Sequence, residues 1–395
     1  MSTPSGGRHF LQIPGPTNVP DRVLRAIDHA TIDHRSADFA ALGKEVLAGL
    51  RTVFATEHPV IIYPASGTGA WEAALVNTLS PGDRVLMFET GHFSFLWQAM
   101  AARLGLEVEL IPGDWRRGVD PARIEERLVA DAQHGIRAVC VVHNETSTGV
   151  CSKVSDVRAA IDRASHPALF LVDTISSLGS IDYRHDAWGV DVTVGGSQKG
   201  LMLPPGLSFN AVSPKALEAS KNARLTRAYW DWAPMLQANQ DGYFPYTPST
   251  NLLFGLREAL RMLAEETLPR VFARHARHAA AARAAVRTWG LELNPLDEQE
   301  HSNALTAVRM PEGFDEAKLR AVILDRFDMS LGQGLGKLKG RLFRIGHLGH
   351  FNDLALCATL SGVELGLQLA GVPSQPGGVQ AALGYLAECA TRAES

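Results

Sequence analysis

Hydrophobic residues in this chain gather into short continuous runs that alternate with segments of helical spacing. Residues 155–164 have apolar side chains at the intervals of one helix face, and Ser155 is the expected N-cap. Continuous apolar strands that alternate with helices predict an α/β fold with a largely parallel sheet covered on both faces. The strand-like runs cover residues 59–63, 84–88, 136–142, 168–172, 190–194 and 207–212.

The pattern changes near Pro269. A long helix rich in alanine and arginine is predicted over residues 270–289, followed by strands over residues 304–308 and 342–345. An amphipathic helix is predicted over Asp353–Leu369. At about 100–200 residues per domain, a chain of 395 residues has room for two or three domains. We expect an N-terminal arm, a large domain and a small C-terminal α+β domain, over residues 1–15, 16–268 and 269–395.

Composition argues against a membrane, secreted or nucleic-acid-binding protein. With 46% hydrophobic and 20% charged residues, the chain has an ordinary soluble globular composition. A net charge of −4 gives no electrostatic reason to expect nucleic acid as a partner. No apolar run approaches the roughly 20 residues that span a bilayer, so we expect no membrane partner. The polar start lacks the core of a secretory signal and the last residues are not the common peroxisomal tripeptide, which predicts a cytoplasmic protein.

The cysteines and histidines do not predict a metal site. The four cysteines lack the paired spacing of metal ligands. His275 and His278 lie three residues apart on the predicted helix, but Arg274 and Arg277 flank them. We interpret the histidine pair as part of a solvated basic face.

A lysine directly after a buried strand is the most informative chemical feature of the chain. The apolar run 190–194 is followed by small residues and then by Lys199. A charged amine is costly against the edge of a sheet, yet lysine is the side chain whose amine forms a Schiff base with an aldehyde. A solvated lysine at the end of a strand is the alternative interpretation.

A carboxylate ends the preceding strand. Asp173 follows the run 168–172, and enzymes built on parallel sheets place ligand-binding groups at this edge. A helix cap or a turn residue is the alternative use of an aspartate here. Together, Asp173 and Lys199 match pyridoxal phosphate (PLP) chemistry, in which a lysine holds the aldehyde and an aspartate pairs with the pyridinium nitrogen.

Two glycine-rich segments are candidate phosphate sites. Residues 66–70, Ser-Gly-Thr-Gly-Ala, follow the run 59–63 and open a predicted helix that ends near Ser80. Free amides at a helix start, glycines and a threonine hydroxyl form a cradle for phosphate, although the segment lacks the lysine of a P-loop. Residues 332–336, Gly-Gln-Gly-Leu-Gly, are interpreted as a flexible loop.

The chain resembles the fold-type I, class V PLP-dependent aminotransferases, and within them the serine–glyoxylate and alanine–glyoxylate group. The resemblance runs through nearly the whole chain, and its segments occur in the family order. It implies a large domain with a mostly parallel seven-stranded sheet, a smaller C-terminal α+β domain and pyridoxal 5′-phosphate as the cofactor. The segments are residues 14–18, 66–70, 143–149, 197–200 and 344–346, with Asp173, Ser176 and Ser177.

The resemblance assigns most candidate site residues to the cofactor. It implies that Lys199 binds the cofactor aldehyde and that Asp173 contacts the pyridine nitrogen. Phe93 falls where relatives stack an aromatic ring, although a phenylalanine here can equally be a core residue. A local backbone bond is the alternative for the hydroxyl of Thr146. The other implied contacts are Thr68, Gly69 and Ala70 for the phosphate, Gln198 for the phosphate or ring hydroxyl, and Thr146 near the ring oxygen.

Two arginines are candidate substrate ligands. Arg344 resembles the family arginine that binds the substrate α-carboxylate, and a planar guanidinium can make two parallel bonds to such a group. A surface arginine is the alternative, but Arg344 has apolar residues on both sides. Arg35 is expected to line the substrate pocket.

The resemblance also implies a homodimer with shared active sites. In relatives, the partner subunit supplies phosphate contacts from a Tyr-x-x-Thr segment. Thr247 is retained here, but Phe244 stands at the tyrosine position. This departure removes one hydroxyl unless Tyr243 or Tyr246 replaces it.

The expected reaction is amino transfer from a small amino acid, first of all L-serine, to glyoxylate, with hydroxypyruvate and glycine as products. Alanine or aspartate is the alternative donor. Another class V reaction, such as cysteine desulfuration, needs a reactive cysteine, and neither Cys357 nor Cys389 has such a context. A nicotinamide-dependent enzyme would need Gly-x-Gly-x-x-Gly after its first strand, which is absent. A non-enzymatic binding protein would have no need of both Lys199 and Asp173.

Overall fold

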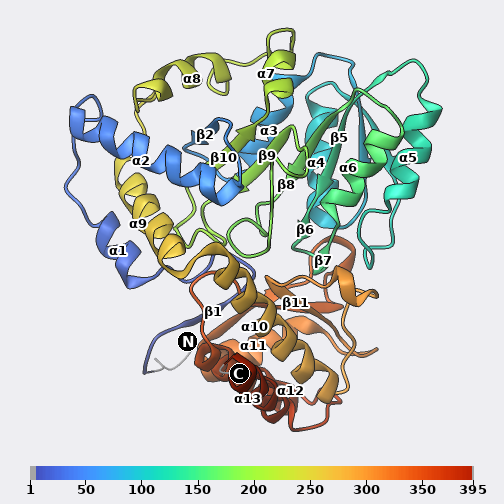
Figure 1. The fold of residues 1–395 in the computed structure, drawn as a ribbon. Helices are drawn as coiled ribbons and strands as arrows, with labels where there is room; N and C mark the ends of the chain where they lie inside the picture. Colours follow the sequence, from blue (N-terminus) through green and yellow to red (C-terminus); the bar gives the residue numbers. More distant parts are fainter. Residues whose placement is uncertain (1–5, 394–395) are drawn as a thin grey trace.

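Within residues 6–393, the part of the chain that the computed structural model describes, seven strands form one large sheet (Figure 1). The strands are β2 (Val60–Tyr63), β3 (Arg84–Phe88), β4 (Glu107–Ile111), β5 (Ile136–Val142), β8 (Leu169–Asp173), β9 (Val192–Gly196) and β10 (Ser208–Val212). Their order is β2-β10-β9-β8-β5-β3-β4. β10 runs antiparallel to both neighbours and the other pairs are parallel. The expected mostly parallel, seven-stranded sheet is confirmed.

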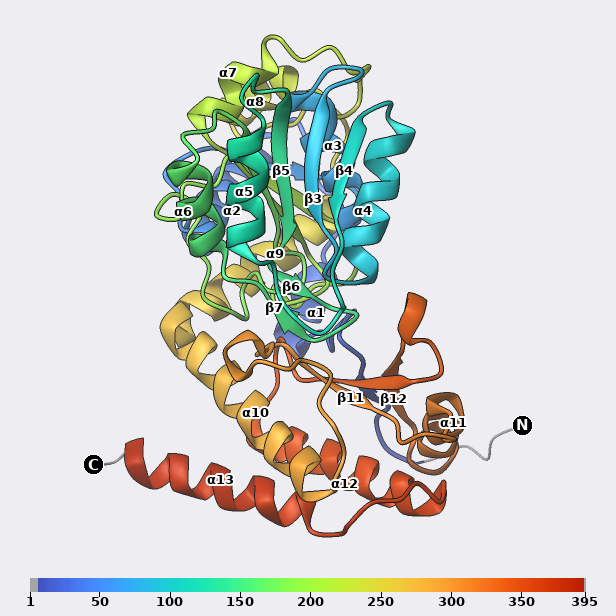
Figure 2. The ribbon, with the colours of Figure 1, turned by 90° about the vertical axis from the view of Figure 1, so that its right-hand side faces the viewer.

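Helices cover both faces of this sheet, which explains why its strands are continuous apolar runs. Val85 and Met87 of β3 pack with α3 and α4, whereas Leu86 and Phe88 pack on the opposite face with α5 and α6. α2 and α9 cover that second face beside β2 and β10. Figure 2 shows α4 on one side of β3 and β5, and α5 and α6 on the other. The helices are α2 (Ala37–Phe54), α3 (Gly67–Thr78), α4 (His92–Arg103), α5 (Pro121–Ala130), α6 (Val154–Arg163) and α9 (Thr250–Glu266).

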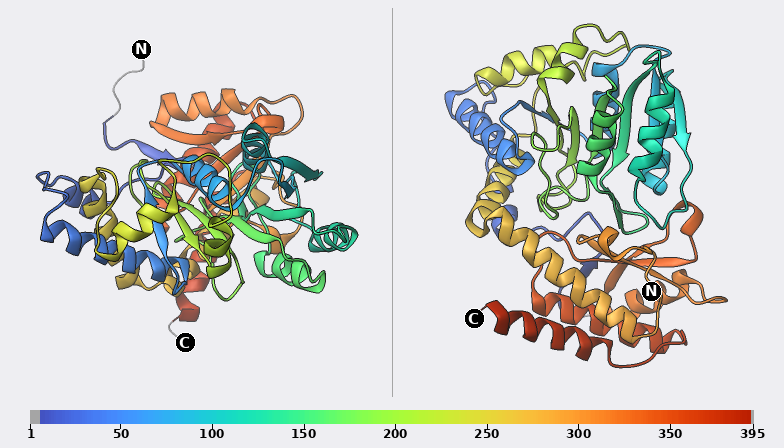
Figure 3. Two further views of the ribbon diagram at one scale, coloured as in Figure 1. Left: turned by 90° about the horizontal axis from the view of Figure 1, so that it is seen from above. Right: turned by 45° about the vertical axis from the view of Figure 1, so that its right-hand side comes forward.

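A second sheet, with four strands among the described residues, lies below the large one in Figure 2. Its elements and covering helices are β1 (Phe10–Gln12), α10 (Leu268–Thr288), β11 (Leu305–Arg309), α11 (Glu316–Phe327), β12 (Met329–Gln333), β13 (Leu342–Gly346), α12 (Asp353–Leu369) and α13 (Gly378–Ala393). The order is β1-β12-β13-β11, and β1 pairs in parallel with β12. The start of the described chain therefore belongs to the C-terminal sheet, and Figure 3 shows it against the orange and red segment.

The other described elements are short. They are α1 (Asp21–Ile27), β6 (Asn144–Glu145), β7 (Val150–Cys151), α7 (Pro214–Ser220), α8 (Trp232–Gln240) and 3-10 helices over Glu298–Glu300 and Gly336–Leu338. None of the helices within residues 6–393 has the length and hydrophobicity to cross a membrane. The division into arm, large domain and small domain stays a prediction, and residues 1–5 and 394–395 of its outer segments lie outside the described residues.

Two local predictions are wrong. Ser155 is not the N-cap, because the cap is Lys153, two residues earlier, and the buried Val154 opens α6. Residues 332–336 are not a loop throughout, because Gly336 begins a 3-10 helix and the first two residues belong to a strand. Gly332 and Gln333 end strand β12, and a side chain at Gly332 would lie 2.7 Å from Cδ of Pro14. A glycine here therefore serves close packing rather than flexibility.

Candidate active site

Most of the predicted site residues lie beyond the carboxyl ends of parallel strands, at one edge of the large sheet. Asp173 is the last residue of β8, and Lys199 follows the end of the neighbouring strand β9. Thr146 follows β5, and Phe93 lies in the first turn of α4, after β3. The loops that leave this edge bring segments far apart in sequence to the same place.

The carboxylate of Asp173 is buried and held by two donors. Its Oδ1 accepts from the backbone N–H of Ile175 at 2.7 Å, and its Oδ2 accepts from Nε1 of Trp71 at 3.1 Å. The residue is 4% exposed, and burial raises the pKa of Asp173 to about 7. A cation beside this carboxylate would favour its ionised form. The site is therefore suited to a protonated ring nitrogen.

Lys199 is also buried, at 8% exposed. Nζ donates to the carbonyl of Pro14, and burial, followed by the charge of Arg344, lowers the pKa of Lys199 to about 7. Thr17 donates its hydroxyl to the Lys199 carbonyl at 3.2 Å. Gly15 has a positive φ of 95°, and any side chain there would overlap that of Lys199. The segment 14–17 thus forms one wall around the amine, a role that its sequence alone did not indicate.

Arg344 is a buried cation whose hydrogen bonds all go to neutral groups. It lies in β13, is 6% exposed, and donates to two backbone carbonyls: Nε to Gln333 at 2.9 Å and Nη1 to Thr146 at 2.8 Å. Burial lowers the pKa of Arg344 to about 10. Carbonyl partners fix the plane of the guanidinium without supplying a charge, and the carboxylates that act on it electrostatically, Glu145 and Glu316, make no ion pair with it. An anionic ligand is the partner that this geometry lacks.

The candidate phosphate segment opens helix α3. The N-cap residue Ser66 makes no side-chain cap bond; Thr68 is exposed, Gly69 is half-buried and Ala70 is buried. A side chain at Gly67 would overlap Ile175, so glycine lets the helix start approach the loop after Asp173. This start offers amides to an anion beside the carboxylate.

Three further predicted residues complete this edge. Phe93 is half-buried, and its ring contacts that of Trp71 edge-on, with the centroids 6.5 Å apart. The hydroxyl of Thr146 donates to Oγ of Ser176 at 2.7 Å, so the alternative of a local backbone bond is wrong. Oε1 of Gln198 is buried without a partner. The sequence alone did not indicate Trp71 as a site residue, because its bond to Asp173 depends on a contact between a helix and a strand that lie 102 residues apart.

Arg35 and Thr247 lie in a different cavity. Both are exposed, and they line a cavity of about 330 Å³ that Lys199 does not line. The hydroxyl of Tyr243 donates to the Ser36 carbonyl at 3.5 Å, and that of Tyr246 donates to the Ile62 carbonyl. Both tyrosine protons are thus engaged within this chain.

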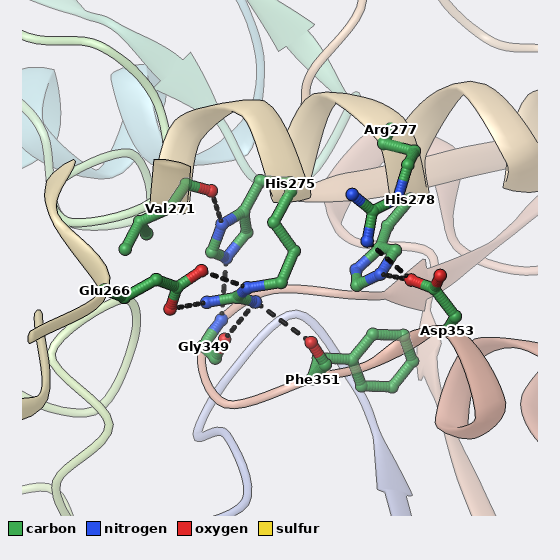
Figure 4. A network of polar contacts seen from close by, with 9 residues as sticks. Glu266, Val271, His275, Arg277, His278, Gly349, Phe351 and Asp353 are labelled. Carbon is green, nitrogen blue, oxygen red and sulfur yellow. Dashed lines mark hydrogen bonds and ion pairs between the residues drawn. The ribbon is translucent and has the colours of Figure 1, made fainter. Parts of the chain in front are cut away.

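The solvated basic face predicted around the histidine pair is wrong. His275 and His278 are fully buried between α10 and the segment that leads into α12 (Figure 4). Nε2 of His275 accepts from the Gly349 amide at 3.0 Å, and Nε2 of His278 lies 2.7 Å from Asp353. The α10 face turns inward because the C-terminal helices pack over it, which helical spacing does not reveal. Among residues 6–393, no group of three or more metal-ligating side chains exists.

The groups at the sheet edge fit pyridoxal 5′-phosphate. They provide an amine with its pKa lowered to about 7, a carboxylate for a ring nitrogen, an open helix start for a phosphate and an unpartnered amide oxygen at Gln198. Together with the seven-stranded sheet, they define a fold-type I PLP-dependent enzyme.

Comparisons with known proteins agree. The chain matches the family model described as Aminotransferase class-V over residues 9–334. It is 49% identical to serine–glyoxylate aminotransferase of Methylorubrum extorquens, over 97% of each chain, and 46% identical to L-aspartate–glyoxylate aminotransferase of Paracoccus denitrificans, over 94% of each. The crystal structure of pyridoxamine–pyruvate aminotransferase from Mesorhizobium loti matches with a TM-score of 0.91 at 27% identity, covering 98% of this chain and 100% of that one. The chain belongs to the class V aminotransferase family, and it is a PLP-dependent aminotransferase.

Proposed function

We propose that the enzyme transfers the amino group of L-serine to glyoxylate, yielding hydroxypyruvate and glycine. The observation that carries amino transfer is the buried edge that Asp173, Lys199 and Arg344 share. The Methylorubrum relative favours serine as the donor. L-Aspartate is the second candidate, favoured by the Paracoccus relative, and L-alanine is the third, from the resemblance to the alanine–glyoxylate group.

The cofactor, when bound, supplies an aldehyde carbon that takes up amino groups and a ring that withdraws electrons from the neighbouring carbon. The chain is proposed to hold it at both ends, with Asp173 at the ring nitrogen and the start of α3 at the phosphate. Phe93 would cover the ring face and keep water away. The residues proposed to contact the cofactor are Thr68, Gly69, Ala70, Phe93, Thr146, Asp173, Gln198 and Lys199, together with Thr247 of the partner subunit.

Lys199 is the proposed base. A pKa of about 7 leaves a large fraction of its amine neutral at neutral pH, as a base requires. Nζ could then take the proton from the α-carbon of the donor and return it to the cofactor carbon that carried the aldehyde. The same amine serves both halves of the reaction, which predicts ping-pong kinetics.

Arg344 is the proposed anchor for the carboxylate of the donor and, in the second half, of glyoxylate. Its two carbonyl partners orient the guanidinium, and its charge, which has no ion-pair partner among the described residues, attracts an anion. Both substrates carry one carboxylate next to the reacting carbon. A single anchor therefore suits both, and fixes the α-carbon relative to the base.

The donor preference can be measured directly. We expect kcat/KM with glyoxylate to be highest for L-serine, roughly tenfold or more above L-alanine and L-aspartate, since one pocket contact separates substrates by about 10–200-fold. D-Serine is the control, because it carries the same groups in the wrong configuration. A higher kcat/KM for L-aspartate would move the assignment to the second candidate. Faster turnover with 2-oxoglutarate than with glyoxylate would overturn the acceptor.

We also propose a homodimer with shared active sites. Arg35 and Thr247 are exposed and line a cavity apart from Lys199, as expected of groups offered to a partner subunit. Sedimentation equilibrium should give twice the chain mass of 42.7 kDa. Mixing an Arg35→Ala chain with a Lys199→Ala chain should restore activity, because one site of the mixed dimer keeps both groups. A monomeric mass, or no recovery, would contradict shared sites.

A cytoplasmic location is proposed from the cysteines. All four are free, as in a reducing compartment. Cell fractionation tests this, and recovery of the protein in a secreted or organellar fraction would contradict it.

A further inference from the structure

Glu145 is a fully buried carboxylate to which none of the roles above is assigned. It ends β6 and is 0% exposed, between Asn144 and Thr146. A charge at such a depth is costly unless hydrogen bonds replace its water. Its partners therefore indicate what it is for.

Every hydrogen-bond partner of this carboxylate is a backbone or hydroxyl donor. Oε1 accepts from the backbone N–H groups of Phe93 at 3.3 Å and Ser147 at 3.0 Å, and from Oγ of Ser147 at 2.6 Å. Oε2 accepts from the N–H of Ser94 at 3.1 Å. Burial raises the pKa of Glu145, and these bonds oppose the rise. Four donated hydrogen bonds favour the ionised form, because a carboxylate only accepts.

These hydrogen bonds fix the position of the first turn of helix α4. Its first three residues are His92, Phe93 and Ser94; the N–H of His92 donates to Oγ of Ser147 at 2.9 Å, and the next two donate to Glu145. The free amides at a helix start attract a negative charge. Contact is close, because a side chain at Gly91 would lie 2.5 Å from Cγ of Glu145.

The same short segment reaches the substrate anchor. Thr146, next to Glu145, bonds Ser176 through its hydroxyl and accepts from Arg344 through its carbonyl. The carboxylate thus joins the helix that carries Phe93 to the loop that orients Arg344. Moving Glu145 would displace the aromatic ring directly, through the Phe93 amide.

We propose that Glu145 is a positioning residue that holds the ring of Phe93 against the cofactor face. This inference rests on the proposed stacking role of Phe93. The amide of Glu145→Gln has nearly the same shape, but its NH₂ group would face donors, so the start of α4 should move.

A double-mutant cycle on cofactor affinity tests the inference. PLP is titrated into the apoenzymes of the wild type, Glu145→Gln, Phe93→Ala and the double variant, and its dissociation constant is read from absorbance. We expect Glu145→Gln to weaken binding about tenfold in the wild-type background and less than about twofold in the Phe93→Ala background, since coupled neighbours are non-additive. Equal weakening in both backgrounds, or none in either, would overturn the inference.

One further variant serves as a control for Glu145→Gln, and a second can replace it in the cycle. Glu89→Gln removes another buried carboxylate after β3, one held by Trp115 at 2.8 Å and Lys337 at 2.5 Å, and PLP affinity should change less than about twofold. Ser147→Ala removes the hydroxyl that bridges Glu145 and His92 and leaves the carboxylate in place. If Glu145→Gln does not fold, Ser147→Ala takes its place in the cycle, and its effect on PLP affinity should likewise shrink in the Phe93→Ala background. Additive effects of Ser147→Ala and Phe93→Ala on PLP affinity would refute the inference. A wild type that binds no PLP would instead contradict the proposed function.

Discussion

Replacing Lys199 with alanine is expected to abolish turnover with serine and glyoxylate, by a factor on the order of 10⁴. The variant loses both the amine that bonds the cofactor aldehyde and the base that moves the α-proton. The visible absorbance band of lysine-bound PLP should disappear as well. Steady-state assays and absorbance spectra of the purified variant measure both effects.

Lys215→Ala is the matched control for this loss. Lys215 donates to the Ala168 carbonyl at 2.8 Å, at the amino end of β8 and so at the opposite edge of the sheet from Lys199. Turnover and the absorbance band should survive in this variant. Continued multiple turnover by Lys199→Ala would refute the assignment of the base.

The second large effect is expected from Asp173→Asn. Breaking a buried charge pair costs about 3–5 kcal/mol, and about 1.4 kcal/mol is tenfold in rate, so kcat should fall roughly 10³-fold. The asparagine cannot hold a positive ring nitrogen, and one of its ends must meet a donor, from either Trp71 or Ile175. The measurement is kcat with saturating serine and glyoxylate.

The control for Asp173→Asn is Asp191→Asn. Asp191 is also buried, but it accepts from the Phe170 amide at 2.8 Å, before the start of β9. Its loss should lower thermal stability and leave PLP affinity nearly unchanged. A kcat for Asp173→Asn within tenfold of the wild type would show that the ring nitrogen does not depend on this carboxylate.

Much of this architecture could be predicted because the pattern of hydrophobic residues within each segment determines its secondary structure. Strand β3 has the same bounds as the apolar run 84–88, and helix α12 covers the predicted residues Asp353–Leu369. Buried parallel strands show their burial in every residue, which makes them easy to recognise. The positions of Lys199 and Asp173 follow, because parallel strands end at one edge.

Other features depend on contacts between distant segments. The burial of His275 comes from the loop at Gly349, and the support of Asp173 comes from the indole of Trp71. The wall around Lys199 comes from Pro14, which lies 185 residues away in the chain. Helical spacing and strand patterns carry no information on such pairs. The roles assigned to Arg35 and Thr247 depend on a second chain and stay predictions.

Reductive trapping tests the central claim, a covalent bond between Lys199 and PLP, most directly. Wild-type apoenzyme is mixed with PLP over a range of pH, reduced with borohydride, digested and mapped by mass spectrometry. The label should lie on the peptide that contains Lys199. Because only the neutral amine attacks the aldehyde, its rate of capture should rise as the pH increases through about 7, the lowered pKa of Lys199. Labelling of other lysines in its place, or capture that begins only near the ordinary lysine pKa of about 10.4, would contradict the account.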